Sequence, residues 1–403
     1  MPLDLRLPSR PITLNARPLL PAPIVPSDEL EARLSRTRAA MSRCETDVLI
    51  LTDEKNVRYF TDYRTLSWTY HARPVLAVLT LERLLVFGSL GELRLMESVP
   101  RPFSPIAYDG YLPGAVDAIV DQISAMPASS RRRIAVDYGP DMFGRGSLYL
   151  IDRLKQIASD ESVRSATDIL WQIRLIKTPF EAEMKKVALA IVNDAFDQVI
   201  GNAYAGISEF ELCQMMQAQI YLNGAESADP IAMLFSDGDF FYGRTPSDRK
   251  LKEGHYIWTD FRATYGGYPA DRNRIARCGE PSDWEIATYK SVRSLTIELV
   301  NGIRPGLRCC DIYSNFQRLW KEADLGQIYG HVSRIGHGGG LDVTEPPSIS
   351  AADQTVIEPG MIFHLEPKLE KNGAVFQFEE VVFVRDGGVE FLSDLSPERI
   401  PVV

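Results

Sequence analysis

Short apolar runs alternate with amphipathic stretches through the first half of the chain. Runs of three to five apolar residues, which are typical of buried strands, occur at 48–51, 75–79, 84–87 and 134–136. Apolar residues at helical spacing indicate helices at 116–123 and 148–154. This alternation predicts a compact α/β domain.

Two helix starts mark the edges of this domain. Ser27 followed by two acids is typical of an N-cap, and it predicts a helix of about four turns before the first strand. Residues 178–181 form a capping box with proline at the first helical position, so we expect a long helix from there to about Ile200. The predicted domains are therefore 27–172 and 173–403.

The second half combines longer helices with widely spaced strands. Helices are predicted at 209–222, 283–301 and 311–322, and the second of these opens on another capping box. Strand-like runs occur at 256–260, 361–367 and 375–384. Strands separated by helix pairs predict an α+β domain.

Composition adds few constraints beyond this outline. The 403 residues include 45% hydrophobic and 24% charged residues, as in ordinary soluble domains. Residues 1–26 contain seven prolines, which interrupt helices and remove backbone donors, so this segment is predicted to be an extended arm.

Charge and cysteine usage narrow the choice of partners and compartment. A formal net charge of −10 without a basic run argues against a nucleic-acid partner. The five cysteines form no CxxC pair and fit a reducing compartment. Neither a secretory leader nor an apolar run of about 18 residues is found, so we expect a cytoplasmic protein without a membrane partner.

Two acids flank a Gly-Gly turn between extended stretches. Asp260 and Asp271 stand on either side of Gly266 and Gly267, and a hairpin there would place the two acids opposite each other. Neighbouring carboxylates repel, and a metal ion between them would remove that repulsion. The alternative is a hairpin whose two acids are satisfied separately.

A single histidine, His337, lies among the glycines of 336–340. The glycines would let the backbone approach a ligand closely and would leave the imidazole unobstructed. Taken alone, a glycine-rich turn with an incidental histidine is the simpler explanation.

Two late apolar strands each carry an acid. Glu366 lies in 361–367, and Glu379 lies in 376–382. A buried acid needs a partner or a metal ion, because an unpaired charge in the interior costs several kcal/mol. The alternative is an edge strand that exposes Glu379 and Glu380 to solvent.

These positions together supply four carboxylates and one imidazole. The set consists of Asp260, Asp271, His337, Glu366 and Glu379. Hard, oxygen-rich ligands with one nitrogen favour manganese, iron, cobalt or zinc over copper or a thiolate-bound zinc. Two such divalent ions about 3.5–4 Å apart activate a shared water and polarise a carbonyl group.

In order and spacing, the five residues resemble the metal ligands of the creatinase/methionine aminopeptidase/prolidase family, also called peptidase family M24. The resemblance extends to 248–254 before the first acid, to 267–268 and Arg274 around the second, and to 358–361 before Glu366. The segment from Val48 to Tyr63 resembles the N-terminal domain of creatinase and the Xaa-Pro peptidases. The resemblance implies a C-terminal pita-bread domain, an N-terminal α/β creatinase-type domain and a homodimer.

The resemblance also implies a role for each ligand. Asp260 would chelate one metal ion, and His337 with Glu366 would hold the other. Asp271 and Glu379 would bridge the two ions. Glu366 would also shuttle the proton of the metal-bound water.

Three positions depart from the Xaa-Pro peptidases, which usually carry two further substrate-binding histidines. Thr344 stands seven residues after His337, where one histidine is expected, and the other position falls in 240–244, which contains Tyr242. Arg262 replaces the glycine that is usual two residues after the first metal acid. We expect Arg262, Tyr242 and Thr344 to bind substrate. The alternative for Arg262 is a pair with a structural acid.

Two further positions are open to more than one interpretation. His364 alternates into register with Glu366 and is predicted to supply the missing acid/base function. Its alternative is a core residue or a hydrogen-bonded neighbour of a ligand. Glu380 competes with Glu379 as the last ligand, but Glu379 fits the family's acid-acid-x-apolar pattern better.

The predicted function is a metal-dependent hydrolase resembling Xaa-Pro dipeptidase or aminopeptidase, which uses a metal-activated water to attack an amide-type C–N bond of a dipeptide or another small molecule. The alternative is a creatinase-, ectoine hydrolase- or dimethylsulfoniopropionate lyase-like enzyme that acts on a small zwitterionic solute. A third class, the inactive binding module, is disfavoured because all five ligand positions are retained.

Overall fold

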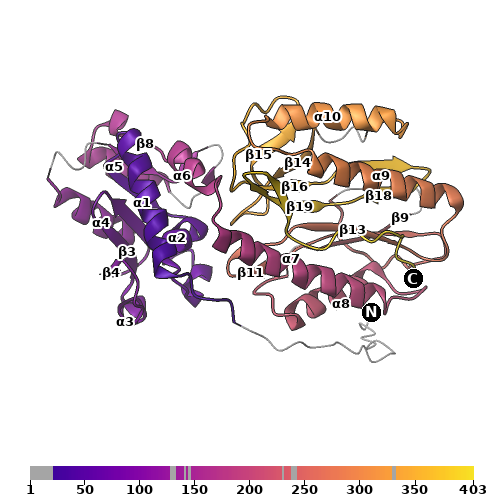
Figure 1. Cartoon of the computed structure of the whole chain (residues 1–403). Helices are drawn as coiled ribbons and strands as arrows, with labels where there is room; N and C mark the ends of the chain where they lie inside the picture. Colours follow the sequence, from indigo (N-terminus) through magenta and orange to yellow (C-terminus); the bar gives the residue numbers. More distant parts are fainter. Residues whose placement is uncertain are drawn as a thin grey trace, which may run out of the picture. The chain divides into compact units, whose positions relative to one another are not determined.

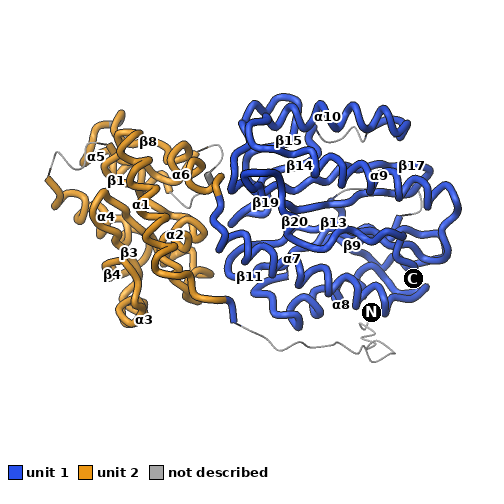
Figure 2. Tube along the Cα trace, viewed as in Figure 1, with its two compact units in different colours: residues 1–22, 177–403 blue, residues 23–176 orange. Residues whose placement is uncertain are grey.

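The computed structural model describes residues 21–127, 133–139, 142–143, 147–228, 231–236, 243–328 and 333–403. The chain divides into two compact units between Ile176 and Lys177 (Figure 2). Residues 1–20 of the predicted proline-rich arm lie outside the described residues. None of the helices in the described part of the chain is long and apolar enough to cross a membrane.

The N-terminal unit, Pro23–Ile176, is built on a six-stranded sheet in the order β4-β3-β2-β1-β5-β8. β1 pairs with β2 in antiparallel and with β5 in parallel orientation. Apolar side chains of α4 and α5 pack on these strands in one buried core. The strands are β1 Val48–Leu51, β2 Leu76–Thr80, β3 Leu84–Ser89, β4 Ser104–Tyr108, β5 Ile134–Val136, β6 Tyr138–Gly139, β7 Met142–Phe143 and β8 Val163–Ser165. The helices are α1 Ser27–Arg43, α2 Glu54–Thr61, α3 Leu93–Ser98, α4 Leu112–Ser124, α5 Leu148–Ile157 and α6 Thr167–Arg174.

The C-terminal unit contains a five-stranded sheet in the order β15-β14-β16-β19-β20 and a three-stranded sheet in the order β13-β10-β9. Two short hairpins, β11-β12 and β17-β18, complete its strands. The bounds are β9 Ala232–Ser236, β10 Tyr256–Phe261, β11 Thr264–Tyr265, β12 Tyr268–Pro269, β13 Arg272–Arg277, β14 Arg334–Gly338, β15 Glu345–Ser350, β16 Ile362–Leu365, β17 Lys368–Lys371, β18 Ala374–Gln377, β19 Glu380–Arg385 and β20 Gly388–Phe391.

Two helix pairs pack against these strands (Figure 1). The first pair is α7 Pro179–Ile200 and α8 Glu209–Leu222, and the second is α9 Asp283–Asn301 and α10 Cys309–Glu322. Capping boxes start α7 and α9 as predicted. The apolar faces of α7 and α8 form one core with residues of β9, β10 and β13.

The start of α1 differs from the prediction that Ser27 is its N-cap. The helix begins at Ser27 itself, and Pro26 occupies the N-cap position without a side-chain cap. The backbone explains this shift, because the carbonyl of Pro26 accepts the first helical hydrogen bond from the amide of Leu30 at 3.1 Å.

The predicted Gly-Gly hairpin is confirmed. Gly266 and Gly267 have φ angles of 60° and 84°, which only glycine adopts without strain. Beyond this turn, β10 and β13 pair in antiparallel register with Asp260 opposite Asn273. The expectation that Asp260 and Asp271 stand directly opposite each other is therefore wrong, because the register places Asn273 there. Asp271 directly precedes β13 and therefore lies close to Asp260.

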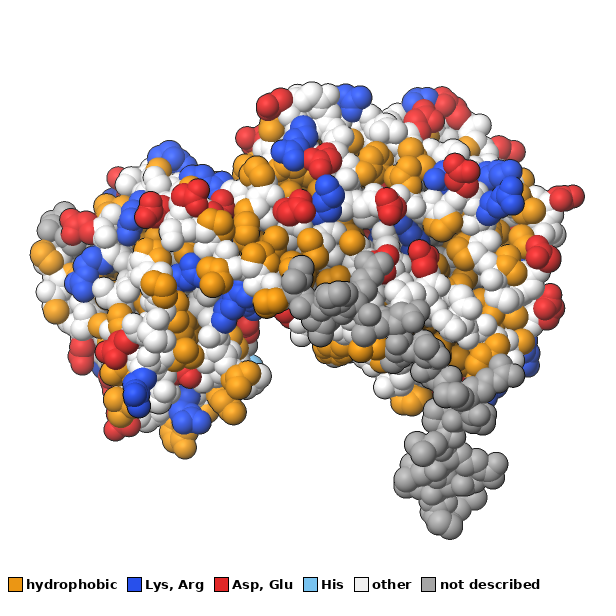
Figure 3. Space-filling model, turned by 60° about the horizontal axis from the view of Figure 1, so that its bottom comes forward, with side chains coloured by type: hydrophobic (Ala, Val, Ile, Leu, Met, Phe, Trp, Pro, Cys, Tyr) orange, Lys and Arg blue, Asp and Glu red, His pale blue; other side chains and the backbone are white. Residues whose placement is uncertain are grey.

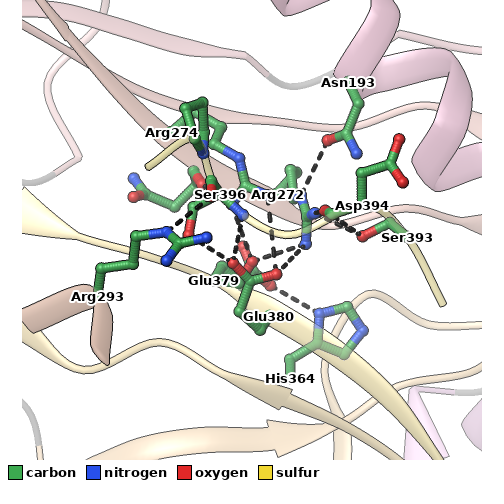
Figure 4. Close-up of polar contacts among 12 residues, drawn as sticks. Asn193, Arg272, Arg274, Arg293, His364, Glu379, Glu380, Ser393, Asp394 and Ser396 are labelled. Carbon is green, nitrogen blue, oxygen red and sulfur yellow. Dashed lines mark hydrogen bonds and ion pairs between the residues drawn. The ribbon is translucent and has the colours of Figure 1, made fainter. Parts of the chain in front are cut away.

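The strand predicted over 375–384 is broken at Glu379 and forms β18 and β19 instead. At the break, two arginine side chains donate hydrogen bonds to a backbone carbonyl oxygen (Figure 4). Nη1 of Arg272 and Nη1 of Arg274 both donate to the carbonyl oxygen of Glu379, at 2.7 and 3.0 Å. Because side chains take the place of a neighbouring strand, the ladder is interrupted there.

The next residue, Glu380, anchors the same arginines. Its carboxylate lies 3.4 Å from Nη1 of Arg272 and accepts hydrogen bonds from the amide and hydroxyl of Ser396 at 2.8 and 2.7 Å (Figure 4). Both members of the Arg272–Glu380 pair are fully buried. The pair therefore fixes the backbone that carries Glu379.

Glu380→Ala should destabilise the fold severely, because it leaves two buried guanidinium groups without their carboxylate. Breaking a buried pair costs roughly 3–5 kcal/mol. Chemical denaturation gives the free energy of unfolding directly. The control is Glu390→Ala, which removes the half-exposed partner of Arg385 and should cost less than about 1 kcal/mol. Equal effects of the two substitutions would contradict the anchoring role of Glu380.

Candidate metal centre

Four buried side chains of the C-terminal unit converge on one point. They are Asp271, His337, His364 and Glu379, and each offers a ligand atom within 4.8 Å of the others. Asp271 directly precedes β13, His337 lies in β14, His364 lies in β16, and Glu379 lies between β18 and β19. Segments more than 100 residues apart therefore meet in one cluster of the kind that holds a metal ion.

Asp260 and Glu366 border this cluster. Oε1 of Glu366 lies 3.6 Å from Nε2 of His337, and Oδ2 of Asp271 lies at the same distance from that nitrogen. Burial, together with the charges of Asp271 and Glu366, raises the pKa of Asp260 well above its usual value. Burial and the charge of Asp271 likewise raise the pKa of Glu366 to about 7.

The crowded carboxylates call for positive charge between them. Burial and the neighbouring acids also raise the pKa of Glu379. Oδ1 of Asp260 is buried and has no hydrogen-bond partner within the described ranges. Buried acids that repel one another and offer unpaired oxygens fit divalent metal ions. The donor set therefore agrees with the predicted metal chemistry.

His337 is oriented to present one nitrogen to the cluster. Its Nδ1 lies 2.8 Å from the carbonyl oxygen of Gly338, so this nitrogen carries the proton and Nε2 is left with a lone pair. Burial lowers the pKa of His337 to about 4, which keeps the ring neutral. A neutral imidazole whose other nitrogen donates to a carbonyl is the usual form of a metal-bound histidine.

The glycines around His337 allow β14 to pack closely between β15 and β16. A methyl group at Gly336 would lie 2.2 Å from the carbonyl oxygen of His364. One at Gly338 would lie 2.3 Å from the carbonyl oxygen of Pro346. The predicted reason for the glycines was close approach to a ligand, and the structure adds close approach of neighbouring strands.

His364 lies directly against Glu379. Its Nδ1 is 2.7 Å from Oε1 of Glu379, and its ring stacks on that of His337 with centroids 4.9 Å apart. This position matches the interpretation of His364 as a hydrogen-bonded neighbour of a ligand. Its acid/base role stays a prediction.

Glu379, rather than Glu380, faces the cluster, because the carboxylate of Glu380 is held by Arg272 and Ser396.

Of the predicted substrate-binding residues, Arg262 lies beside the cluster, with its Nε 3.4 Å from Oδ1 of Asp271 and its side chain 29% exposed. Thr344 is exposed on the loop after β14, and Tyr242 lies outside the described residues.

Several polar residues around the cluster were not anticipated. Gln377 donates to Oε2 of Glu366 at 3.1 Å and accepts from Nε1 of Trp258 at 2.9 Å. Lys177 and Glu345 form a fully buried ion pair of 2.9 Å beside the glycine-rich loop. Lys185 of α7 is also fully buried. Its spacing from Ala188 and Val192 on the apolar face of the helix was the signal that could have revealed it.

The chain is similar to known peptidases. The Xaa-Pro dipeptidase of Pyrococcus furiosus is 27% identical over 261 residues, which cover 64% of this chain and 74% of that protein. An uncharacterized peptidase of Bacillus subtilis is 23% identical over 360 residues, which cover 88% of this chain and 96% of that protein.

Solved structures share the fold of the whole chain. An Xaa-Pro dipeptidase from Bacillus anthracis superposes with a TM-score of 0.79 at 22% identity, covering 93% of this chain and 100% of the other. An X-Pro aminopeptidase from Thermotoga maritima superposes with a TM-score of 0.77 at 22% identity, covering 92% and 99%. Both matches confirm the predicted α+β fold with its pita-bread domain and creatinase-type N-terminal domain.

Family models match both halves of the sequence. The creatinase/prolidase N-terminal domain matches residues 33–176. The model of metallopeptidase family M24 matches residues 183–386, which include all five predicted ligands. These matches confirm the predicted class, a metal-dependent hydrolase. The chain belongs to metallopeptidase family M24.

Proposed function

We propose that this protein is a dinuclear metallopeptidase that hydrolyses Xaa-Pro dipeptides. The observation that carries the proposal is the buried cluster of Asp271, His337 and Glu379 with Asp260 and Glu366 beside it, in a chain of family M24. The names of its relatives, Xaa-Pro dipeptidase and X-Pro aminopeptidase, support the substrate class.

Five residues would hold the two ions: Asp260, Asp271, His337, Glu366 and Glu379. When bound, the ions would supply an activated water and polarise the scissile carbonyl. Glu366 would also hold and release the proton of the activated water, because its carboxylate lies beside His337 at the edge of the cluster and is partly exposed. Gln377 holds one oxygen of that carboxylate and leaves the other toward His337.

Arg262 is proposed to bind the carboxylate of the substrate. It is a partly exposed cation beside Asp271, and its guanidinium can present two parallel N–H groups to a carboxylate. Thr344 and Tyr242 are proposed as further substrate contacts, and His364 as an acid/base group.

The finer assignments follow the same resemblance. We propose manganese, iron, cobalt or zinc as the metal, a homodimer, a cytoplasmic location, and domains at 27–172 and 173–403. A small substrate is favoured over nucleic acid, and acidic and basic side chains are interspersed on the face shown in Figure 3.

A substrate screen tests the proposal. The Mn²⁺-loaded protein should release proline from Xaa-Pro dipeptides, and neither the chelated protein nor Glu366→Gln should do so. Turnover of compact zwitterions or guanidino compounds, with none of the dipeptides, would replace the proposal by the solute-hydrolase alternative. Arg262 beside Asp271 is the feature that favours that alternative.

The ligand assignment predicts metal content. Asp271→Ala and Glu379→Ala should each lower the occupancy of both ions, because each carboxylate would bridge them. Elemental analysis of the purified proteins gives the metal content per chain. The control is Glu370→Ala, which removes an exposed acid of β17 and should leave metal content unchanged. Full metal content in Asp271→Ala would refute the assignment.

The site also predicts how stability depends on pH. In the metal-free protein the raised pKa of Glu366 stabilises the fold at low pH, and this contribution is lost as pH rises from about 4.5 to about 7. Metal binding needs the deprotonated carboxylate and a neutral His337, so it strengthens over the same range. The melting temperature of the metal-saturated protein minus that of the metal-free protein should therefore widen from about pH 5 to about pH 8. A constant difference would show that this carboxylate is not a ligand.

Arg262→Lys should impair substrate binding without affecting the metal centre. Lysine keeps the charge but loses the bidentate geometry, which is worth about 1.5–3 kcal/mol, or roughly a ten- to hundredfold loss in kcat/KM. Metal content and melting temperature should stay close to those of the wild type. If the variant instead loses metal or unfolds while its active fraction keeps its KM, Arg262 is a structural counter-ion of Asp271.

A further inference from the structure

A buried lysine lies close to the cluster of candidate metal ligands. Lys185 of α7 is fully buried, and its Nζ has no hydrogen-bond partner in the described part of the chain. Lys186, one position further on, has a 48% exposed side chain near Glu390. A buried ammonium without a partner is costly, so its retention calls for a specific role.

His364 offers the acceptor that Lys185 lacks. Its Nδ1 points at Glu379, whereas Nε2 points away from that carboxylate (Figure 4) and, within the described residues, has no partner. A neutral imidazole has one donor and one acceptor nitrogen. When Glu379 is ionised, as a metal ligand must be, Nδ1 is the donor and Nε2 is a buried acceptor.

The two unpartnered nitrogens border the same glycine. A methyl group at Gly339 would lie 2.6 Å from Nε2 of His364 and 2.9 Å from Nζ of Lys185. The missing side chain at Gly339 therefore lets both nitrogens lie close to its Cα, where a methyl group would collide with them. Of the two groups, the ammonium offers donors only and the imidazole nitrogen offers an acceptor.

We infer that Lys185 is a positioning residue for the metal centre: its ammonium donates to Nε2 of His364 and thereby fixes the proton on the nitrogen that holds Glu379. Because the two nitrogens form no direct hydrogen bond in the structure, the donation passes through one water beside Gly339 or needs a small rotation of the lysine side chain. The inference rests on the proposed role of Glu379 as a metal ligand.

The hydrogen bond from His364 would then control the orientation of the Glu379 carboxylate, which is proposed to bridge the two metal ions. With the proton fixed on Nδ1, His364 keeps Oε1 of Glu379 engaged at 2.7 Å and restricts the carboxylate to one orientation. Without Lys185, the proton could move to Nε2, and a bare Nδ1 would then repel the carboxylate. Partners of this kind typically change metal affinity about 10- to 100-fold.

A simpler role for Lys185 would be that of a general counter-ion. Asp271, Glu345 and Glu379 are close enough to act on its charge, while burial lowers its pKa to about 8. A counter-ion would act on the acids whether or not His364 were present. The two roles therefore differ in whether the effect of Lys185 passes through His364.

Titration of the full-length, metal-free protein with Co²⁺, followed by visible absorption, distinguishes these roles. Lys185→Met removes the ammonium but keeps a long apolar side chain. It should weaken Co²⁺ binding about 10- to 100-fold and change the absorption spectrum. The melting temperature of each metal-free variant is measured as well, so that a general loss of stability is distinguished from a loss of Co²⁺ affinity. Lys186→Met is the matched control and should bind Co²⁺ like the wild type.

A double-mutant cycle shows whether Lys185 acts through His364. His364→Asn keeps an amide donor close to the position of Nδ1 but has no atom in place of Nε2. In that background, Lys185→Met should cause no further loss of Co²⁺ affinity. An equal loss in both backgrounds would identify Lys185 as a counter-ion and overturn the inference. Unchanged or tighter Co²⁺ binding by Lys185→Met would overturn it as well.

Two further variants separate the possible causes of failure. If Lys185→Met does not fold, Gly339→Ala is used instead, because it keeps both side chains but places a methyl group against both nitrogens. This variant should weaken Co²⁺ binding. Wild-type Co²⁺ affinity in Gly339→Ala would overturn the inference. Wild-type Co²⁺ binding by Glu379→Ala would instead show that the ligand assignment is wrong, whereas dipeptide hydrolysis tests the proposed function independently.

Discussion

The compensation of buried negative charge is the constraint on which the C-terminal unit depends. Asp260, Asp271, Glu366 and Glu379 meet in the interior, and burial raises the pKa of three of them. Such a group is stable only if cations approach it or if protons neutralise it. Metal binding and folding would therefore be linked in this domain, because the same carboxylates repel one another without metal ions and would bind them.

The surrounding structure holds the acids in place against this repulsion. Arg272 and Arg274 bind the carbonyl of Glu379, and Glu380 neutralises the two guanidinium groups. On the other side of the cluster, the close packing of β14 against β16 fixes His337. Glu379 thus faces the cluster, whereas its neighbour Glu380 holds the backbone of this segment in place.

Local signals made part of this structure predictable. The capping box at 178–181 and the Gly-Gly turn depend on residues within a few positions, so the start of α7 and the hairpin between the first two acids were predicted correctly. The break at Glu379 depends on arginines more than 100 residues away and left no local trace. The burial of Lys185 had a local signal in its helical spacing, but its neighbours did not, since only the assembled fold brings Gly339 beside it.

Arg262 and Lys185, two of the cations near the cluster, differ in exposure and therefore in the roles that they can have. Arg262 is partly exposed and pairs loosely with Asp271 at 3.4 Å, so an incoming carboxylate could compete for its guanidinium. Lys185 is fully buried beside His364 and cannot meet a substrate without rearrangement of the core. The partly exposed charge of Arg262 therefore suits selection of the substrate, whereas the buried charge of Lys185 suits control of the ligands. A substitution at 262 would therefore change which substrate binds while leaving the five ligands in place, whereas a substitution at 185 would change how firmly the ligands hold the metal ions.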